Sequence, residues 1–145
     1  MTTLADIQDA IIDTLKSMTN ETGHPVFKDV EPWVSSDAND VENAKGIRAP
    51  SAFVVFLKAD ELDTAQETTQ WGVFTVTGGV RDKAERNRNA METAESVAKT
   101  LRNNRLGLKK ITSVKALGID NLYSESLDRN GMGLFGISFE IKRHL

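Results

Sequence analysis

The residues with the clearest chemical potential lie near the end of the chain, where Glu140 and Lys142 are two residues apart. In a strand, this spacing places a carboxylate and an amine on the same face. Many metal-dependent nucleases use such a pair, with an acidic residue earlier in the chain, to hold Mg²⁺ and activate water. Asp120 or Asp128 could supply that acidic residue. Alternating charges on a solvated strand give the same pattern, and the chain ends three residues after Lys142, where that nuclease core normally continues.

Other side chains that could react or bind a metal are few. The two histidines, His24 and His144, have no second ligand at the spacing of a zinc site. The absence of cysteine excludes disulfides and thiol catalysis. Gly78-Gly79 lacks the later Gly and Lys-Ser/Thr of a phosphate-binding loop, and no Gly-x-Ser-x-Gly motif occurs. We therefore expect a protein that is not an enzyme and that uses no cofactor and no metal.

Length and composition indicate one globular domain over residues 1–145. Hydrophobic residues make up 39% and charged residues 27% of the chain, which is typical of folded domains. The N-terminus lacks the basic and apolar segments of a signal peptide, and no apolar run approaches the ~18 residues of a membrane span. We expect a protein that starts in the cytoplasm and does not contact a membrane.

Charge is unevenly distributed along the chain. Residues 1–50 carry 9 acidic and 4 basic residues, a net charge of −5, whereas residues 81–110 carry 4 acidic and 9 basic residues, a net charge of +5. The basic segment could be a solvated helix face, a footprint for nucleic acid, or one side of a contact between identical subunits. No motif for reading bases accompanies it, so sequence-specific nucleic-acid binding is not expected. Arg81, Arg86 and Arg88 are candidates for a subunit contact.

Apolar spacing predicts two helices. In the first, Leu4, Ile7, Ile11, Leu15 and Met18 share one face, and Thr3 with Asp6 forms an N-terminal capping pair. The second covers 82–103, begins at a capping Asp82, and has an apolar stripe of Ala84, Met91, Ala94, Val97, Ala98 and Leu101.

Six segments have the composition or alternation of strands: 26–33, 51–58, 70–81, 111–117, 122–127 and a final strand from 135. In the last strand, Phe135, Ile137, Phe139 and Ile141 predict one buried face, and Asn130-Gly131 before it predicts a hairpin turn. Segments 34–50 and 59–69 are predicted loops. The predicted fold is therefore α+β, with the order α-β-β-β-α-β-β-β and a mainly antiparallel sheet with two helices packed on one face.

The two tryptophans, Trp33 and Trp71, have two possible roles. They could pack in the core or at its edge, or they could anchor a subunit interface, where tryptophan is enriched.

These features together resemble the tail-terminator and tail-completion proteins of long-tailed bacteriophages, in particular the small tail protein of Mu-like prophages. The likeness rests on the following features of the chain: the Ile/Leu-rich helix of residues 7–18, Val30-Glu31-Pro32-Trp33, Ala49-Pro50 before Phe53-Val54-Val55-Phe56, the helix of residues 81–101, and the Gly-x-x-x-Phe-x-Ile of residues 131–137.

The resemblance implies a structural virion protein that forms a homo-oligomeric ring of six subunits. Such a ring caps the tail tube, ends its polymerisation and prepares head–tail joining, so its partners would be itself, the tail tube protein and head–neck proteins. The protein would be in the virion tail, and in the host cytoplasm during assembly. The loops of residues 34–50 and 59–69 would then be candidates for gripping the tube.

Overall fold

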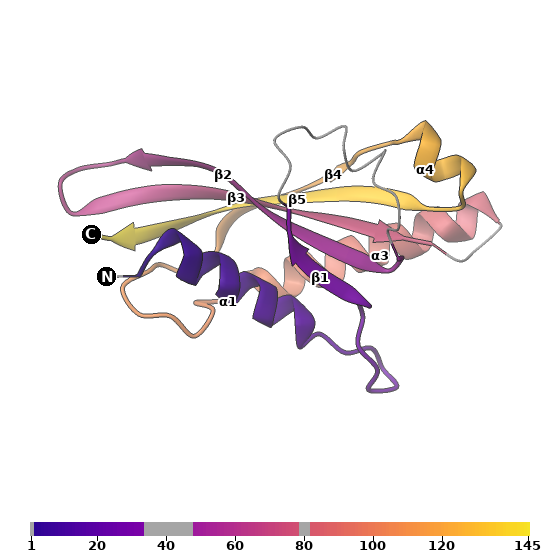
Figure 1. Cartoon of the computed structure of the whole chain (residues 1–145), viewed down its shortest axis with the longest axis horizontal. Helices are drawn as coiled ribbons and strands as arrows, with labels where there is room; N and C mark the ends of the chain where they lie inside the picture. Colours follow the sequence, from indigo (N-terminus) through magenta and orange to yellow (C-terminus); the bar gives the residue numbers. More distant parts are fainter. Residues whose placement is uncertain (1, 34–47, 79–81) are drawn as a thin grey trace.

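The computed structural model describes residues 2–33, 48–78 and 82–145, and these form an α+β fold around a five-stranded sheet (Figure 1). In chain order the elements are α1 (Leu4–Lys16), β1 (Asp29–Pro32), β2 (Ser51–Glu61), β3 (Gln66–Thr77), α3 (Lys83–Leu101), β4 (Lys115–Asn121), α4 (Glu125–Arg129) and β5 (Gly133–His144). Among the described helices, none has the length and apolar character to cross a membrane. Most of the predicted loop of residues 34–50 lies outside the described residues.

The sheet has the strand order β1-β2-β3-β5-β4. The pairs β2–β3, β3–β5 and β4–β5 are antiparallel, which confirms a mainly antiparallel sheet. The β1–β2 pair is parallel, with Asp29 opposite Ser51, so the sheet is mixed. The alternation of apolar residues does not distinguish the two directions, because both present side chains with the same period of two.

The first helix begins as its sequence predicts. The Thr3 hydroxyl accepts a hydrogen bond from the Asp6 N–H at 3.0 Å, and the Asp6 carboxylate accepts one from the Thr3 N–H at 2.9 Å. That backbone N–H lowers the pKa of Asp6, because it stabilises the charged carboxylate. Ile7, Ile11 and Leu15 are fully buried below this cap, so the predicted apolar face is the packed face.

The second predicted helix also begins at its expected cap, since the Asp82 carboxylate accepts a hydrogen bond from the Ala84 N–H at 2.9 Å. Its predicted apolar stripe is only partly correct. Ala84 and Met91 are exposed, and the buried positions at that end of α3 are Arg86 and Ala90. Arg86 occupies a buried position with an acidic partner, Asp128, on α4.

The predicted loop of residues 59–69 is mostly strand. Strand β2 continues to Glu61 and β3 begins at Gln66, so only a tight turn separates them. The Asp63 carboxylate closes this turn by accepting hydrogen bonds from the N–H groups of Ala65 and Gln66. A tight turn closed by the Asp63 side chain is therefore found where a long acidic loop was predicted. The hairpin extends past both ends of the chain (Figure 1).

The predicted strand of residues 122–127 is wrong, because this segment leads into the short helix α4. The Ser124 hydroxyl caps the helix by accepting a hydrogen bond from the Leu127 N–H at 3.2 Å. Asn130-Gly131 ends α4 instead of forming a two-residue hairpin. Gly131 has a φ of +75°, so the pair does mark a left-handed position, but at a helix end. The element order is therefore α-β-β-β-α-β-α-β.

The main hydrophobic core joins α1 and α3 to the central strands. Buried residues of β5 contribute as predicted, since Phe135, Ile137, Phe139 and Ile141 all belong to this cluster. A smaller cluster contains Phe53, Val76, Leu127 and Leu134, with Trp33 packed at its border. The first cluster fixes the two long helices on the sheet, and the second holds α4 beside the strands.

Candidate interaction surfaces

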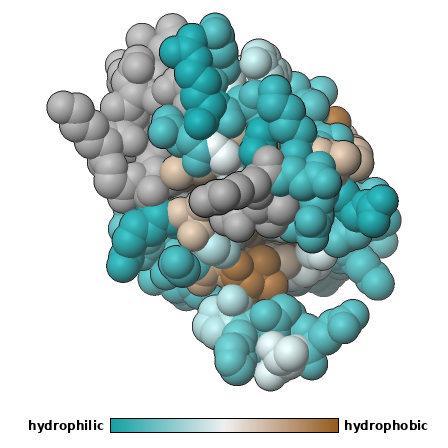
Figure 2. Space-filling model, turned by 90° about the vertical axis from the view of Figure 1, so that its right-hand side faces the viewer, coloured by the Kyte–Doolittle hydropathy of each residue, from teal (hydrophilic) through white to brown (hydrophobic). Residues whose placement is uncertain are grey.

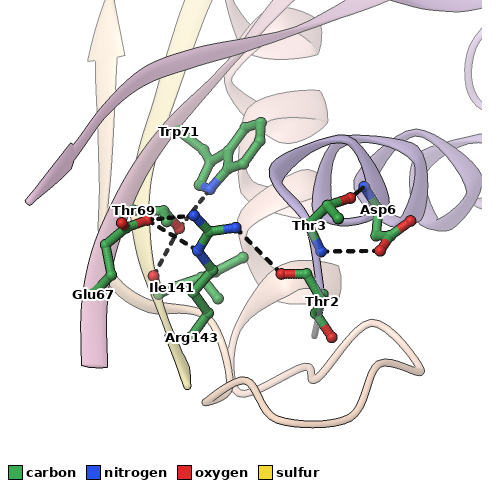
Figure 3. Close-up of polar contacts among 8 residues, drawn as sticks. All are labelled: Thr2, Thr3, Asp6, Glu67, Thr69, Trp71, Ile141 and Arg143. Carbon is green, nitrogen blue, oxygen red and sulfur yellow. Dashed lines mark hydrogen bonds and ion pairs between the residues drawn. The ribbon is translucent and has the colours of Figure 1, made fainter. Parts of the chain in front are cut away.

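Trp71 lies in the core and is fully buried. Its indole N–H donates to the Thr69 hydroxyl at 2.8 Å, and that hydroxyl donates to the carbonyl of Ile141 at 2.7 Å (Figure 3). The interpretation of Trp71 as an interface anchor is therefore corrected, because no part of its side chain is at the surface of the subunit. The neighbouring Phe56 packs edge-on against the indole, with ring centroids 5.2 Å apart, and is itself exposed.

Trp33 lies at the border of the fold. It is half-buried, its ring meets Phe53 edge-on with centroids 5.3 Å apart, and its backbone N–H donates to the Val54 carbonyl at 2.8 Å. This placement leaves part of the indole available to a neighbour, so the prediction of an interface role still stands for Trp33.

The three candidate arginines have different environments. Arg86 is 7% exposed and binds Asp128 at 2.7 Å, so its charge acts inside the subunit, which corrects its interpretation as a surface contact. Arg88 is exposed on α3. Arg81 lies outside the described residues. Arg86 also lowers the pKa of Asp128, because its guanidinium hydrogen-bonds to the charged carboxylate.

Glu140 and Lys142 lie two residues apart on β5, as predicted, but the candidate acidic residues Asp120 and Asp128 are not brought to them. Glu140 lies opposite Gln70 and Lys115, while Asp120 lies opposite Gly136, four residues along β5. That offset corresponds to roughly 13 Å along the strand. Asp128 is occupied by Arg86 and Lys83 at the α4 end of the fold.

No other acidic or histidine cluster supplies a metal site within the described ranges. His24 is exposed in the turn after α1, and the Nδ1 of His144 lies 3.4 Å from the amide nitrogen of Gln66. The two histidines therefore occupy separate parts of the fold.

A second polar network ties the tip of the β2–β3 hairpin to β5 and to the segment before α1. The Arg143 Nε donates to the Glu67 carboxylate at 2.9 Å, and its Nη1 donates to the Thr2 carbonyl at 3.2 Å (Figure 3). Both charged side chains are mostly buried. The pair could not be found from sequence, because only the register of β3 against β5 places Glu67 opposite Arg143.

One group of exposed apolar side chains lies on the outer half of β2 and at its turn. Phe56, Leu57 and Leu62 are between 38% and 52% exposed, and we call them the arm patch. Phe56 contacts Trp71 on one face of the sheet and Leu57 lies beside Gly72 on the other, so the patch wraps around the edge of β2. Strand β1 pairs only with residues 51–54 of β2, so beyond Val54 this side of β2 is an edge within the described part of the sheet. Composition alone did not reveal the patch, because residues 59–69 are rich in acidic and polar residues.

A second group lies between α3 and β4, at the opposite edge of the sheet. Met91, Ile119 and Tyr123 are between 41% and 71% exposed, and we call them the seam patch. Ile119 borders a hollow of about 670 Å³ whose other wall is α3. Tyr123 borders a smaller hollow of about 80 Å³ on the same seam, near the start of α3.

The end of the molecule seen in Figure 2 has a hollow with hydrophobic residues above a hydrophilic projection. In the fold, the turn after α1 faces α3 across a hollow of about 640 Å³, which has Met18 and Val26 on one wall and Asn89 and Ser96 on the other. Its lining mixes polar and apolar groups with charges of both signs (Glu21, Glu92 and Lys99), so it defines no chemistry of its own.

The basic segment divides into parts with different roles. Arg86 is internal, whereas Arg88, Lys99, Arg102, Arg105, Lys109 and Lys110 are exposed. The acidic residues Asp6, Asp9 and Asp13 are exposed along α1. Oppositely charged surfaces therefore coexist on one chain.

Comparison with known proteins assigns the chain to no family, so a proposal for its function depends on the surfaces described above. The chain matches no protein-family model and has no significant match among curated proteins.

Proposed function

We propose that this chain is a structural protein of a bacteriophage tail. Its subunits form a ring, with six members, that caps the tail tube, ends polymerisation of the tube and prepares the joining of the tail to the head. Its partners in this role are further copies of itself, the tail tube protein and head–neck proteins. The whole chain acts as one domain, which assembles in the host cytoplasm and resides in the virion tail.

The observation that carries the proposal is the pair of exposed apolar patches at opposite edges of one sheet. Exposed large apolar residues that gather in patches are typical of protein–protein contacts. The arm patch (Phe56, Leu57 and Leu62) lies beyond β1, and the seam patch (Met91, Ile119 and Tyr123) lies beyond β5. A ring of identical subunits needs two unlike, complementary surfaces on each subunit, and these edges can provide them.

The arrangement of layers also favours a ring subunit. In this proposal, α1 and α3 pack on one face of the sheet and leave the opposite face for the tube. On that opposite face the second cluster and α4 cover one end, where Leu122 lies against Gly136, so the part left open is the end where Val55 pairs with the small residue Gly72. A surface of this kind can approach another protein closely.

The proposal is tested by deleting the gene from its phage or prophage and examining induced lysates by electron microscopy. Overlong or headless tails beside filled heads are expected, with normal particles restored by the wild-type gene supplied in trans. Normal, infectious particles in the deletion strain would exclude a role in ending the tail.

A further inference from the structure

We propose that the arm patch of one copy of this chain docks into the groove between α3 and β4 of the next copy. The occupant of the groove is thus the β2–β3 hairpin of an identical subunit. The inference deepens the proposed function and rests on it only for the closure of the assembly into a ring. The contact itself follows from the shape, polarity and charge of two surfaces of the same chain.

The arm patch is built for side-chain contact and not for strand addition. The edge of β2 carries a register shift between Phe56 and Lys58, and Lys58 pairs with Asp60 at 3.0 Å beside it. Bulges and charged side chains on an edge strand disfavour pairing with another strand. The apolar side chains Leu57 and Leu62 remain exposed on the same element, so they are the groups left to contact a neighbour.

The groove is a hollow of about 670 Å³ with a mixed surface. Ile119 of β4 supplies its exposed apolar side chain, and apart from the buried Ala98 the residues of α3 that line it are polar or charged. Met91 lies four residues before Glu95, which lines this hollow, and four residues after Asn87, which lines the smaller hollow beside Tyr123. Residues spaced by four lie on one side of a helix, so Met91 lies on the side of α3 that links the two hollows.

The distribution of charge determines which way round the arm lies in the groove. Glu61 and Asp63 flank Leu62 at the tip of the arm and are exposed. Lys99 and Arg102 line the groove at the C-terminal end of α3, and neither forms an ion pair with another described residue. Glu92 and Glu95 line the same groove closer to the start of the helix. The acidic tip is therefore oriented towards Lys99 and Arg102 and away from the two glutamates.

The position of the two patches makes the contact head-to-tail. The sheet order β1-β2-β3-β5-β4 separates the free edge of β2 from β4 by two strands, so one chain cannot fill its own groove. Each copy offers one arm and one groove, and the contact repeats from copy to copy. Such a heterologous interface produces a ring if the rotation closes and a filament if it does not.

The test uses the natural absence of cysteine from the chain. Two variants, Leu62→Cys and Ile119→Cys, are purified, checked for unchanged thermal unfolding, mixed at high concentration and treated with a short bis-maleimide. Both positions are exposed, so each variant is expected to fold. Apposition of the two thiols raises their effective concentration, and roughly tenfold more cross-linked dimer is expected than from either variant alone.

The matched control replaces one partner with Asp9→Cys, an exposed position on α1. The mixture of Leu62→Cys and Asp9→Cys is expected to give only the background level of dimer. A chain with both Leu62→Cys and Ile119→Cys is expected to give a ladder of covalent oligomers. The same three reactions are repeated in lysates that contain assembled particles.

Equal cross-linking of the test and control mixtures, in solution and in particles alike, would overturn the inference, as would a predominance of Leu62-to-Leu62 dimers. The result is separable from that of the gene deletion. A tail defect without Leu62-to-Ile119 cross-linking rejects the docking mode alone, whereas cross-linking with normal particles in the deletion strain rejects the tail function alone.

Discussion

Arg86 of α3 and Asp128 of α4 form an ion pair with 2.7 Å between the guanidinium Nη2 and the carboxylate Oδ1, across 42 residues of the chain. The arginine is buried, whereas the aspartate is about a quarter exposed. The pair holds the short helix α4 against the start of α3. It also explains why a charged residue occupies a position that apolar spacing would assign to the core.

We expect Asp128→Asn to lower the melting temperature at neutral pH, because it leaves the charge of Arg86 buried without its full partner. Arg86 holds the pKa of Asp128 below its ordinary value of 3.8, so the ion pair contributes stability above that value. The contribution is lost as the pH falls through the lowered pKa of the folded state. Thermal unfolding followed from pH 7 to strongly acidic pH should show the gap between wild type and variant closing.

Asp120→Asn is the matched control for this experiment, since Asp120 is exposed on β4. Its melting temperature should follow that of the wild type at every pH. A gap for Asp128→Asn that did not change with pH would show that the ion pair is not its origin.

Replacing each tryptophan with alanine should lower the unfolding free energy by different amounts. Trp71→Ala removes a fully buried ring and is expected to cost about 3–5 kcal/mol of unfolding free energy, as large-to-small changes in a core do. Trp33→Ala should cost less, because its ring is half-buried at the border of the fold. Urea unfolding followed by circular dichroism measures both. A smaller loss for Trp71→Ala than for Trp33→Ala would contradict the assignment of Trp71 to the core.

Charge reversal should weaken assembly at Arg88 and leave it unchanged at Lys28. We expect Arg88→Glu to fold normally, because the side chain is exposed, and to assemble less well at low salt than at high salt. Light scattering at several salt concentrations measures the effect. Lys28→Glu, which changes an exposed cation before β1, is the control and should assemble like the wild type. Unchanged assembly of Arg88→Glu at low salt would remove this residue from the electrostatic contact.

The nuclease alternative makes a prediction of its own. Glu140 and Asp120 are separated along the sheet, so we expect no Mg²⁺-dependent cleavage of DNA by the purified protein. Glu140→Ala should then behave like the wild type in the same assay. Cleavage that required Mg²⁺ and disappeared in Glu140→Ala would establish the enzymatic function instead.

Local rules account for the elements that the sequence predicted correctly. Thr3 and Asp6 determine where α1 begins, and Asp82 determines where α3 begins, because each cap is made within three residues. The alternation from Phe135 to Ile141 predicted the buried face of β5, because successive side chains in a strand point to opposite faces.

Long-range pairing accounts for what sequence reasoning missed. The position of Arg86 in its helix gives no sign of burial, because its partner Asp128 comes from α4, 42 residues later. The ion pair of Glu67 with Arg143 depends on the register of β3 against β5. The segment of residues 122–127 has the composition of a strand, yet Ser124 caps a helix there. These outcomes depend on contacts between distant residues, which no local pattern contains.

By itself, the sequence determined the α+β class, the two long helices and the buried face of the last strand, because caps and periodic burial act over a few residues. Only the tertiary structure decided that Trp71 is internal, that β1 joins in parallel, and that Leu62 and Ile119 are exposed at opposite edges of the sheet. The physical reason is that the exposure of a side chain depends on the whole packed fold, because a side chain is at the surface only if no distant element covers it.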